Sequence, residues 1–291
     1  MMDTSELLRK VRKLEIKTKG LTKHIFSGEY HSAFKGRGMS FSEVRDYQYG
    51  DDVRNIDWNV TARTGGPHVK IFEEERELTV MLMIDVSASS FFGTVSRFKN
   101  DIATEMAAVL AFSAITNNDK VGAILFSDRI EKYLPPKKGK QNILRIIREL
   151  INLTPGQRNT NLSEALIYLN NIQKKRSITF ILSDFMTEDY DQALTIASKK
   201  HDIIGVHIHD ERETALPDVG LIKVIDAEKG NQRIIDTSDA NIRHKYAKHY
   251  QDSLEQFKNT FAFAKSDSIC ISTEDDYIKA LQVFFKKRSK R

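Results

Sequence analysis

Residues 79–90 carry the side chains whose types and spacing best suit metal binding. The apolar run 80–84 stops at Asp85, and hydroxyl side chains follow at Ser87 and Ser89. A carboxylate and two hydroxyls at i, i+2 and i+4 offer hard oxygen atoms, which suit Mg²⁺ far better than Zn²⁺ or copper. These oxygens make only half of an octahedral shell, so further ligands must come from elsewhere in the chain.

The run before Asp85 is predicted to be a buried strand in the middle of a sheet, because it is too short for a helix and has no alternating polar face. Similar apolar runs follow at 121–126, 178–182 and 202–209. Strands that alternate with helical segments predict a doubly wound α/β fold with a mostly parallel sheet. Ligands in such sheets bind at the carboxyl ends of the strands, where Asp85 and Asp184 are both expected.

Helical periodicity separates these strands, and a polar turn after 121–126 indicates a hairpin with residues 130–134. Helices are predicted over 98–114, 142–153, 162–172 and 189–200. The segments expected to complete the edge of the same domain are 221–226, 233–236, 241–264, 267–271 and 275–287.

The N-terminal region is expected to form a smaller β-rich segment over residues 1–76, ahead of an α/β domain over 77–291. An amphipathic helix is predicted over residues 4–19, and strands and loops over 30–63. Within this region, residues 45–58 interleave arginines with aspartates and end at a tryptophan. Two interpretations stay open, namely a structural network of Arg–Asp pairs around the tryptophan or a recognition surface.

The amino-acid composition excludes several classes of protein. The chain has 291 residues and a single cysteine, Cys270, which excludes an intramolecular disulfide and a Cys/His zinc site. Basic and acidic residues number 45 and 40 and are intermixed, so the net charge of +5 does not argue for nucleic acid as a partner. The apolar runs are strand-sized, which predicts no membrane insertion and a cytoplasmic location.

Several polar residues have plain structural explanations. Thr160 stands where the helix 162–172 begins, so its hydroxyl is suited either to cap that helix or to bind a metal. Asp128 follows a serine as Asp184 does, but a hairpin turn accounts for it. His207 and His209 lie on one face of a predicted strand, where histidines are usually packed or solvated. A hydroxyl-rich turn without any metal remains the alternative for the Asp85 segment.

Two sets of residues resemble a known family. Asp85-Val-Ser87-Ala-Ser89, Thr160 and Asp184 resemble the three segments of a metal-ion-dependent adhesion site on a von Willebrand factor A-like domain, a Rossmann-like fold. The run Arg-x-Tyr-x-x-Gly-Asp-Asp-x-Arg-x-Ile-Asp-Trp-x-x-x-Ala-Arg over residues 45–63 resembles the signature of the domain of unknown function 58 family.

This resemblance implies a bound Mg²⁺ or Mn²⁺ and a function in protein binding. Ser87, Ser89 and Thr160 would hold the ion directly, and Asp85 and Asp184 would act directly or through water. A partner protein would complete the shell with an Asp or Glu. The family resemblance further implies a non-enzymatic adaptor that works with a MoxR-type AAA+ ATPase in the assembly or activation of other proteins.

The chain departs from the family pattern in its middle loop, and an enzyme remains the alternative. Arg158 and Asn159 precede Thr160 where relatives often have two glycines, which places a cation near the proposed ion. A Mg²⁺-dependent phosphohydrolase with Asp85 as nucleophile is the competing hypothesis. Its usual pattern requires a second carboxylate two residues on, where Ser87 stands.

Overall fold

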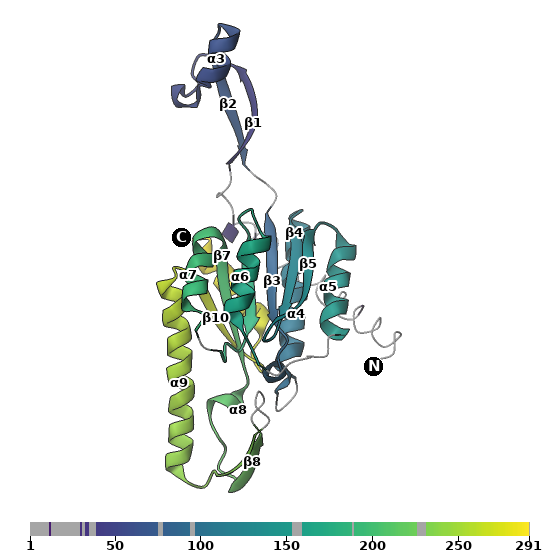
Figure 1. The fold of residues 1–291 in the computed structure, drawn as a ribbon, viewed down its shortest axis with the longest axis vertical. Coiled ribbons are helices and arrows are strands. Elements are labelled where there is room, and N and C mark those ends of the chain that lie inside the picture. Colours follow the sequence, from purple (N-terminus) through teal and green to yellow (C-terminus); the bar gives the residue numbers. More distant parts are fainter. Residues whose placement is uncertain are drawn as a thin grey trace.

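A six-stranded sheet forms the centre of the described structure (Figure 1). The computed structural model describes residues 12, 30, 33–34, 39–74, 78–93, 97–152, 159–187, 189–225 and 231–290. All neighbouring strands are parallel except the last pair. The strand order is β10 (Asp267–Ser272), β7 (Asp202–His209), β6 (Ile178–Ser183), β3 (Thr79–Asp85), β4 (Lys120–Phe126), β5 (Ile130–Lys137). The predicted mostly parallel α/β sheet and the antiparallel hairpin at its edge are confirmed.

Strand β3 lies between β6 and β4, and its burial explains why its sequence is apolar throughout. Successive side chains point to opposite faces of a strand. Val80, Leu82 and Ile84 accordingly join one core cluster, and Met81 and Met83 join the other. The prediction of a central buried strand is confirmed.

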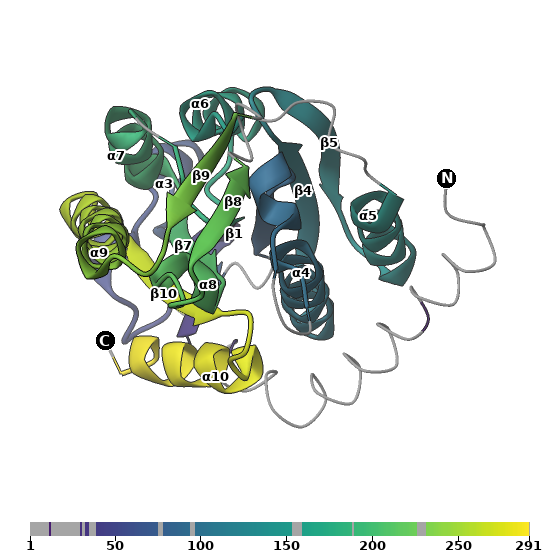
Figure 2. The same cartoon turned by 90° about the horizontal axis from the view of Figure 1, so that it is seen from below.

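Helices cover both faces of the sheet (Figure 2). One core cluster draws on α4 (Lys99–Thr116), α5 (Lys140–Asn152) and α10 (Tyr277–Arg288). The opposite cluster draws on α6 (Leu162–Ile172), α7 (Asp191–Lys200) and α9 (Ala240–Phe263). The six helices agree with the predicted segments to within about three residues at their ends.

Residues 39–74 form an arm that projects from the end of the sheet where β3 begins (Figure 1). In this arm β1 (Met39–Asp46) pairs antiparallel with β2 (His68–Glu74). The connection between them holds a 3₁₀ turn, η2 (Val53–Asn55), and a helix, α3 (Trp58–Thr64). The helix expected over residues 4–19 lies outside the described residues except for Arg12.

The prediction of only strands and loops over residues 30–63 was wrong, because α3 is a helix. Its start is fixed by the Asp57 side chain, which accepts hydrogen bonds from the backbone N–H groups of Asn59 and Val60. Its end is fixed by Gly65, whose φ of 78° lies in the left-handed region that glycine adopts without a steric cost.

The Arg–Asp pairs of the arm do not surround the tryptophan. Arg45 makes a two-pronged contact with Asp51, with both N–O distances at 2.8 Å. Arg54 pairs locally with Asp52 in the same way. Trp58, by contrast, is 69% exposed at the start of α3, so this network holds the connection between β1 and β2 and leaves the indole in solvent.

The segments predicted at the edge of the domain, 221–226 and 233–236, contain two strands that lie outside the main sheet. They form β8 (Leu221–Ile225) and β9 (Gln232–Asp236), an antiparallel pair separate from the main sheet within the described structure. The edge position beside β7 is taken by β10. The hairpin follows a short helix, α8 (Glu211–Thr214), at the end of the molecule opposite the arm (Figure 1).

Candidate functional site

The five predicted site residues meet at the carboxyl ends of β3 and β6. These two strands are neighbours, with Ile84 opposite Leu182. Asp85 is the last residue of β3, and Asp184 comes directly after β6. Because parallel neighbours end at the same edge of a sheet, the fold brings together two carboxylates that are separated by about a hundred residues in sequence.

Both carboxylate oxygens of Asp85 already accept hydrogen bonds inside the protein. Oδ1 accepts from the backbone N–H of Ser87 at 2.9 Å. Oδ2 accepts from the Ser183 hydroxyl at 2.6 Å and from the Thr160 hydroxyl at 3.5 Å, the long limit for such a contact. Asp85 is buried, so these donors fix its orientation and offset part of the cost of burying it.

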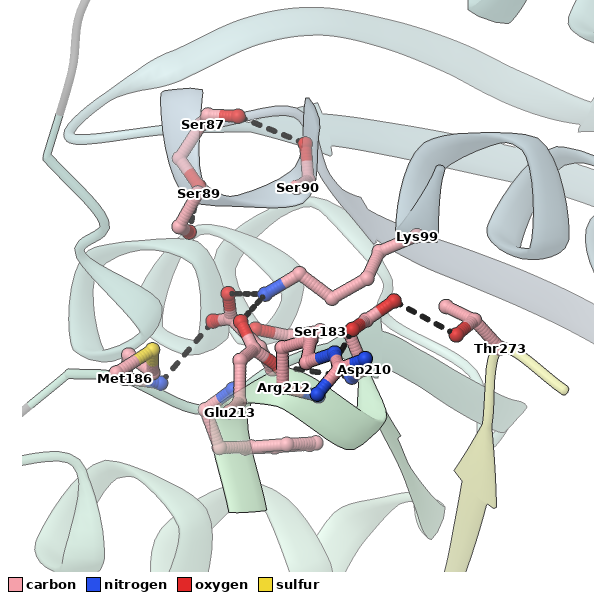
Figure 3. Close-up of polar contacts among 12 residues, drawn as sticks. Ser87, Ser89, Ser90, Lys99, Ser183, Met186, Asp210, Arg212, Glu213 and Thr273 are labelled. Carbon is pink, nitrogen blue, oxygen red and sulfur yellow. Dashed lines mark hydrogen bonds and ion pairs between the residues drawn. The ribbon is translucent and has the colours of Figure 1, made fainter. Parts of the chain in front are cut away.

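The hydroxyl groups lie on a turn that follows β3 directly. Ser87 precedes a 3₁₀ turn, η3 (Ala88–Phe91), and its Oγ lies 3.0 Å from Oγ of Ser89. The Ser90 hydroxyl donates to the carbonyl of Ser87 at 2.7 Å and tightens the turn (Figure 3). All three serines are buried, so the turn holds their hydroxyls inside the protein.

Thr160 reaches the same place from the start of α6. Asn161 caps that helix by accepting from the backbone N–H of Glu164, which leaves the Thr160 hydroxyl available to Asp85. The Thr187 hydroxyl donates to the Thr160 carbonyl at 3.0 Å and ties the loop after β6 to the loop before α6. Arg158, predicted to place a cation near this point, lies outside the described residues.

A buried lysine, missed in the sequence analysis, lies beside Asp184. Lys99 in the first turn of α4 is 2% exposed, and its Nζ lies 2.7 Å from Oδ2 of Asp184 and 2.6 Å from Oε1 of Glu213 in α8 (Figure 3). Sequence gave no sign of this pairing, because a lysine at a helix start is usually solvated and the two acids are distant in the chain.

The surroundings shift the pKa values of the two site carboxylates in opposite directions. Burial raises the pKa of Asp85 to about 6, and the charge of Asp184 adds to the rise. Burial also acts to raise the pKa of Asp184, but the Lys99 ammonium, the hydrogen bond from Ser89 and the N–H of Met186 outweigh it and lower that pKa below its ordinary value. Asp184 is therefore the firmly ionised member of the pair.

The donor set fits a hard divalent cation and little else. Three neutral hydroxyls and two carboxylates present only oxygen atoms, as Mg²⁺ and Mn²⁺ prefer. Within the described part of the chain, His, Cys, Asp and Glu side chains nowhere gather in threes as a metal-binding cluster. A cation here would therefore depend on the hydroxyl groups and Asp85, because Asp184 is already paired with Lys99.

The other polar candidates belong to structural settings. His207 and His209 pack in an aromatic cluster with Phe185, Tyr250 and Phe257, and their ring centroids lie 5.4 Å apart. Burial lowers the pKa of His207 to about 3, so it stays neutral.

Asp128 lies in the turn between β4 and β5, where the Ser127 hydroxyl donates to it at 3.2 Å. Both expectations, packed histidines and a turn aspartate, agree with the structure.

Among the described helices, none is both long and apolar enough to cross a lipid bilayer.

Comparison with known proteins finds relatives over nearly the whole chain. The uncharacterized proteins Mb1516 of Mycobacterium bovis and Rv1480 of Mycobacterium tuberculosis are each 29% identical over 291 residues, which covers 99% of this chain and 91% of the relative.

Among solved structures, a conserved hypothetical protein, BatB from Bacteroides thetaiotaomicron, superposes with a TM-score of 0.48 at 17% identity, covering 74% of this chain and all of that one. The SpRpn10 VWA domain superposes with a TM-score of 0.37 at 12% identity, covering 71% and 93%. The sequence model of the family described as "Protein of unknown function DUF58" matches residues 43–256, well over half of the chain, and the protein therefore belongs to this family.

Proposed function

We propose that this protein is a non-enzymatic binding module that holds Mg²⁺ or Mn²⁺ at the carboxyl edge of its sheet and uses the ion to bind an acidic side chain of a partner protein. The observation that carries the proposal is that the five predicted site residues meet at one edge of the sheet. Asp85, Ser87, Ser89 and Thr160 are linked by direct contacts at one sheet edge, and Ser89 hydrogen-bonds Asp184. Hydroxyl-rich oxygen sites of this kind suit hard cations.

The residues divide into two groups in this proposal. Ser87, Ser89 and Thr160 would hold the ion through their hydroxyl oxygens, and Asp85 and Asp184 would act directly or through water. When bound, the ion would supply positive charge and a coordination position that a carboxylate can take from water. Because Lys99 already neutralises Asp184, the negative charge facing the ion is smaller than two free carboxylates would give.

With a divalent ion bound, the charge around the site would permit a partner that brings a carboxylate. Asp85, Asp184 and Glu213 are balanced in part by Lys99, so with a divalent ion the formal charges of the cluster cancel. An incoming Asp or Glu then meets no net negative charge and finds a cation with an open position.

The phosphohydrolase alternative has less support. Ser87 occupies the position where such enzymes carry their second carboxylate.

The partner class proposed first is a MoxR-type AAA+ ATPase in the cytoplasm. Its support is the resemblance of two separate segments, the Asp85 loop and residues 45–63, to the family linked with such ATPases. The ATPase would have to present an Asp or Glu to the site, which makes the interaction dependent on the divalent ion.

Metal binding is tested by isothermal titration of the purified protein with Mg²⁺ and by the electron paramagnetic resonance signal of free Mn²⁺. We expect Asp85→Asn and Asp184→Asn to weaken binding at least about tenfold. The control is Asp252→Asn, which changes an exposed carboxylate in the middle of α9. Equal loss in the control, or no binding by the wild type at millimolar ion, would contradict the metal site.

Partner binding is tested separately by capture from the native lysate with tagged protein in Mg²⁺ or in EDTA. We expect an AAA+ ATPase among the proteins retained in Mg²⁺ and lost both in EDTA and with Asp85→Asn. Retention of the same proteins under all three conditions would refute a metal-bridged contact.

A further inference from the structure

Four large apolar side chains lie exposed on the loops that carry the candidate site. Phe91, Phe92, Phe98 and Met186, called here the apolar collar, are between 37% and 58% exposed. Each sits within three residues of a residue of the site or of its lysine, Lys99. Exposed apolar residues are ordinary when scattered singly, but several around one polar site mark an interaction surface.

Hydrogen bonds fix the first part of the collar to the site. The N–H of Phe92 donates to the carbonyl of Ser89 at 3.1 Å, and the N–H of Lys99 donates to the carbonyl of Phe92 at 3.0 Å. The Phe92 ring centroid lies 6.0 Å from Nζ of Lys99, the atom that pairs with Asp184. The two ends of this segment are therefore held together beside the buried ion pair.

The fourth collar residue, Met186, lies on the loop after β6. Its N–H donates to Oδ1 of Asp184 at 3.1 Å. The Met186 side chain is 58% exposed. The collar thus has members on both the η3 segment and the loop after β6, and the site carboxylate Asp184 lies between their anchoring contacts.

The four collar side chains do not belong to either hydrophobic core cluster. The buried residues of the two core clusters include neither Phe91, Phe92, Phe98 nor Met186. Methionine and phenylalanine are enriched at the centres of protein interfaces, where they are desolvated by a partner. The neighbouring cation Arg97 is already directed at Glu105, 3.7 Å away, so the collar does not offer the free positive charge that a nucleic acid would require.

We propose that the apolar collar selects the partner, which is a protein segment whose metal-binding Asp or Glu is flanked by large apolar residues. This inference rests on the proposed function, since the carboxylate is directed to the cation and the flanking side chains cover the collar. The central residue of the partner segment is an acid, because Lys99 and a divalent ion would balance the charges of Asp85, Asp184 and Glu213. The residues on either side of that acid are apolar, because they contact collar side chains that carry no charge.

The test uses a peptide library displayed on phage, with a fixed central Asp and random residues on both sides, selected on the full-length protein in Mg²⁺. We expect the selected peptides to carry Leu, Ile, Met, Phe or Trp beside the Asp and to be released by EDTA. Selection of polar or basic flanks, or of no peptide at all, would overturn the proposal.

Variants then locate the contact by fluorescence anisotropy of a selected peptide. Phe91→Gln and Met186→Gln should each weaken peptide binding about tenfold, whereas Ile196→Gln, an exposed apolar position on α7, should leave it unchanged. Mg²⁺ titration of the same samples separates the two proposals. Loss of peptide binding with unchanged metal affinity supports the collar, equal peptide binding by all variants overturns the collar alone, and a wild type that binds no Mg²⁺ overturns both.

Discussion

Replacing Lys99 by methionine is the most informative single change in this protein. Methionine keeps much of the side-chain length and packing but removes the ammonium that joins Asp184 to Glu213. Lys99 and Asp184 are only 2% and 3% exposed, so solvent cannot take the place of the lost cation. The variant therefore leaves two carboxylates close together with no positive partner in the described part of the site.

The size of the effect follows from this burial. Removing one partner of a buried ion pair costs about 3–5 kcal/mol, because the remaining charge is desolvated and unpaired. Here one cation serves two acids, so we expect a loss at the upper end of that range at pH 7.5. Typical proteins unfold with a total of about 5–15 kcal/mol, so the variant should lose a large share of its stability.

The pH dependence has a definite sign. In the variant the folded-state pKa of Asp184 rises above its unfolded value, and the pKa of Glu213, which burial already raises in the wild type, rises further, because burial and mutual repulsion are no longer opposed by Lys99. The folded state then binds protons more readily than the unfolded state, so the penalty is full above the raised pKa values and shrinks as the pH falls toward about 4. The difference from wild type should be smaller at pH 5 than at pH 7.5.

Urea unfolding at pH 5, 6 and 7.5 measures this directly, with Lys223→Met on exposed β8 as the matched control. The triple variant Lys99→Met, Asp184→Asn, Glu213→Gln should recover most of the loss, since it removes the unpaired charges as well. A loss of less than about 1 kcal/mol in the free energy of unfolding at pH 7.5 would be typical of a solvent-exposed ion pair. That result, or a cost independent of pH, would refute the argument from buried charge.

Two further changes test the packing of the core and a buried histidine. A Cβ added at Gly205 would lie 2.5 Å from two ring atoms of buried Phe261. The variant Gly205→Ala should therefore lower the free energy of unfolding in urea by about 1–3 kcal/mol. The control Gly66→Ala should change it very little, because the added Cβ meets no atom within 4 Å. Burial, followed by the charges of nearby basic residues, lowers the pKa of His201 from 6.5 to about 4. Its stabilising effect is fully present above pH 6.5 and is lost as the pH falls toward 4, by up to about 2–3 kcal/mol, and unfolding of His201→Gln should show a shallower pH slope.

The sheet and the meeting of the site residues were predictable because they depend on local patterns and one topological rule. Apolar runs that are too short for a helix and have no polar face are typical of strands covered on both faces, as β3 is. Asp85 and Asp184 each follow such a run, and parallel strands end at a common edge. The placement of Thr160 needed the order of strands as well, since its loop reaches Asp85 across that edge.

The features that escaped prediction depend on contacts between distant segments or on competition for one place in the sheet. Nothing near Lys99 in sequence indicates burial, and Glu213 joins it from more than a hundred residues away. The strands β8 and β9 have ordinary strand composition, which does not show that they pair with each other while β10 takes the free edge of β7. Helix α3 is only seven residues long, and the Asp57 cap that starts it stood in a run whose alternating charges obscured a helical period.

The opposite pKa shifts of the two site carboxylates assign them different tasks at a cation. Asp184 is ionised and held by Lys99, so its charge is already compensated before any ion arrives. Among the described residues no cation pairs with Asp85, and burial raises its pKa to about 6. A divalent ion beside Asp85 would supply the missing positive charge and favour the carboxylate form. The proposed ion and Lys99 therefore do the same electrostatic work for neighbouring acids, which explains why a site with two buried carboxylates needs only one external cation.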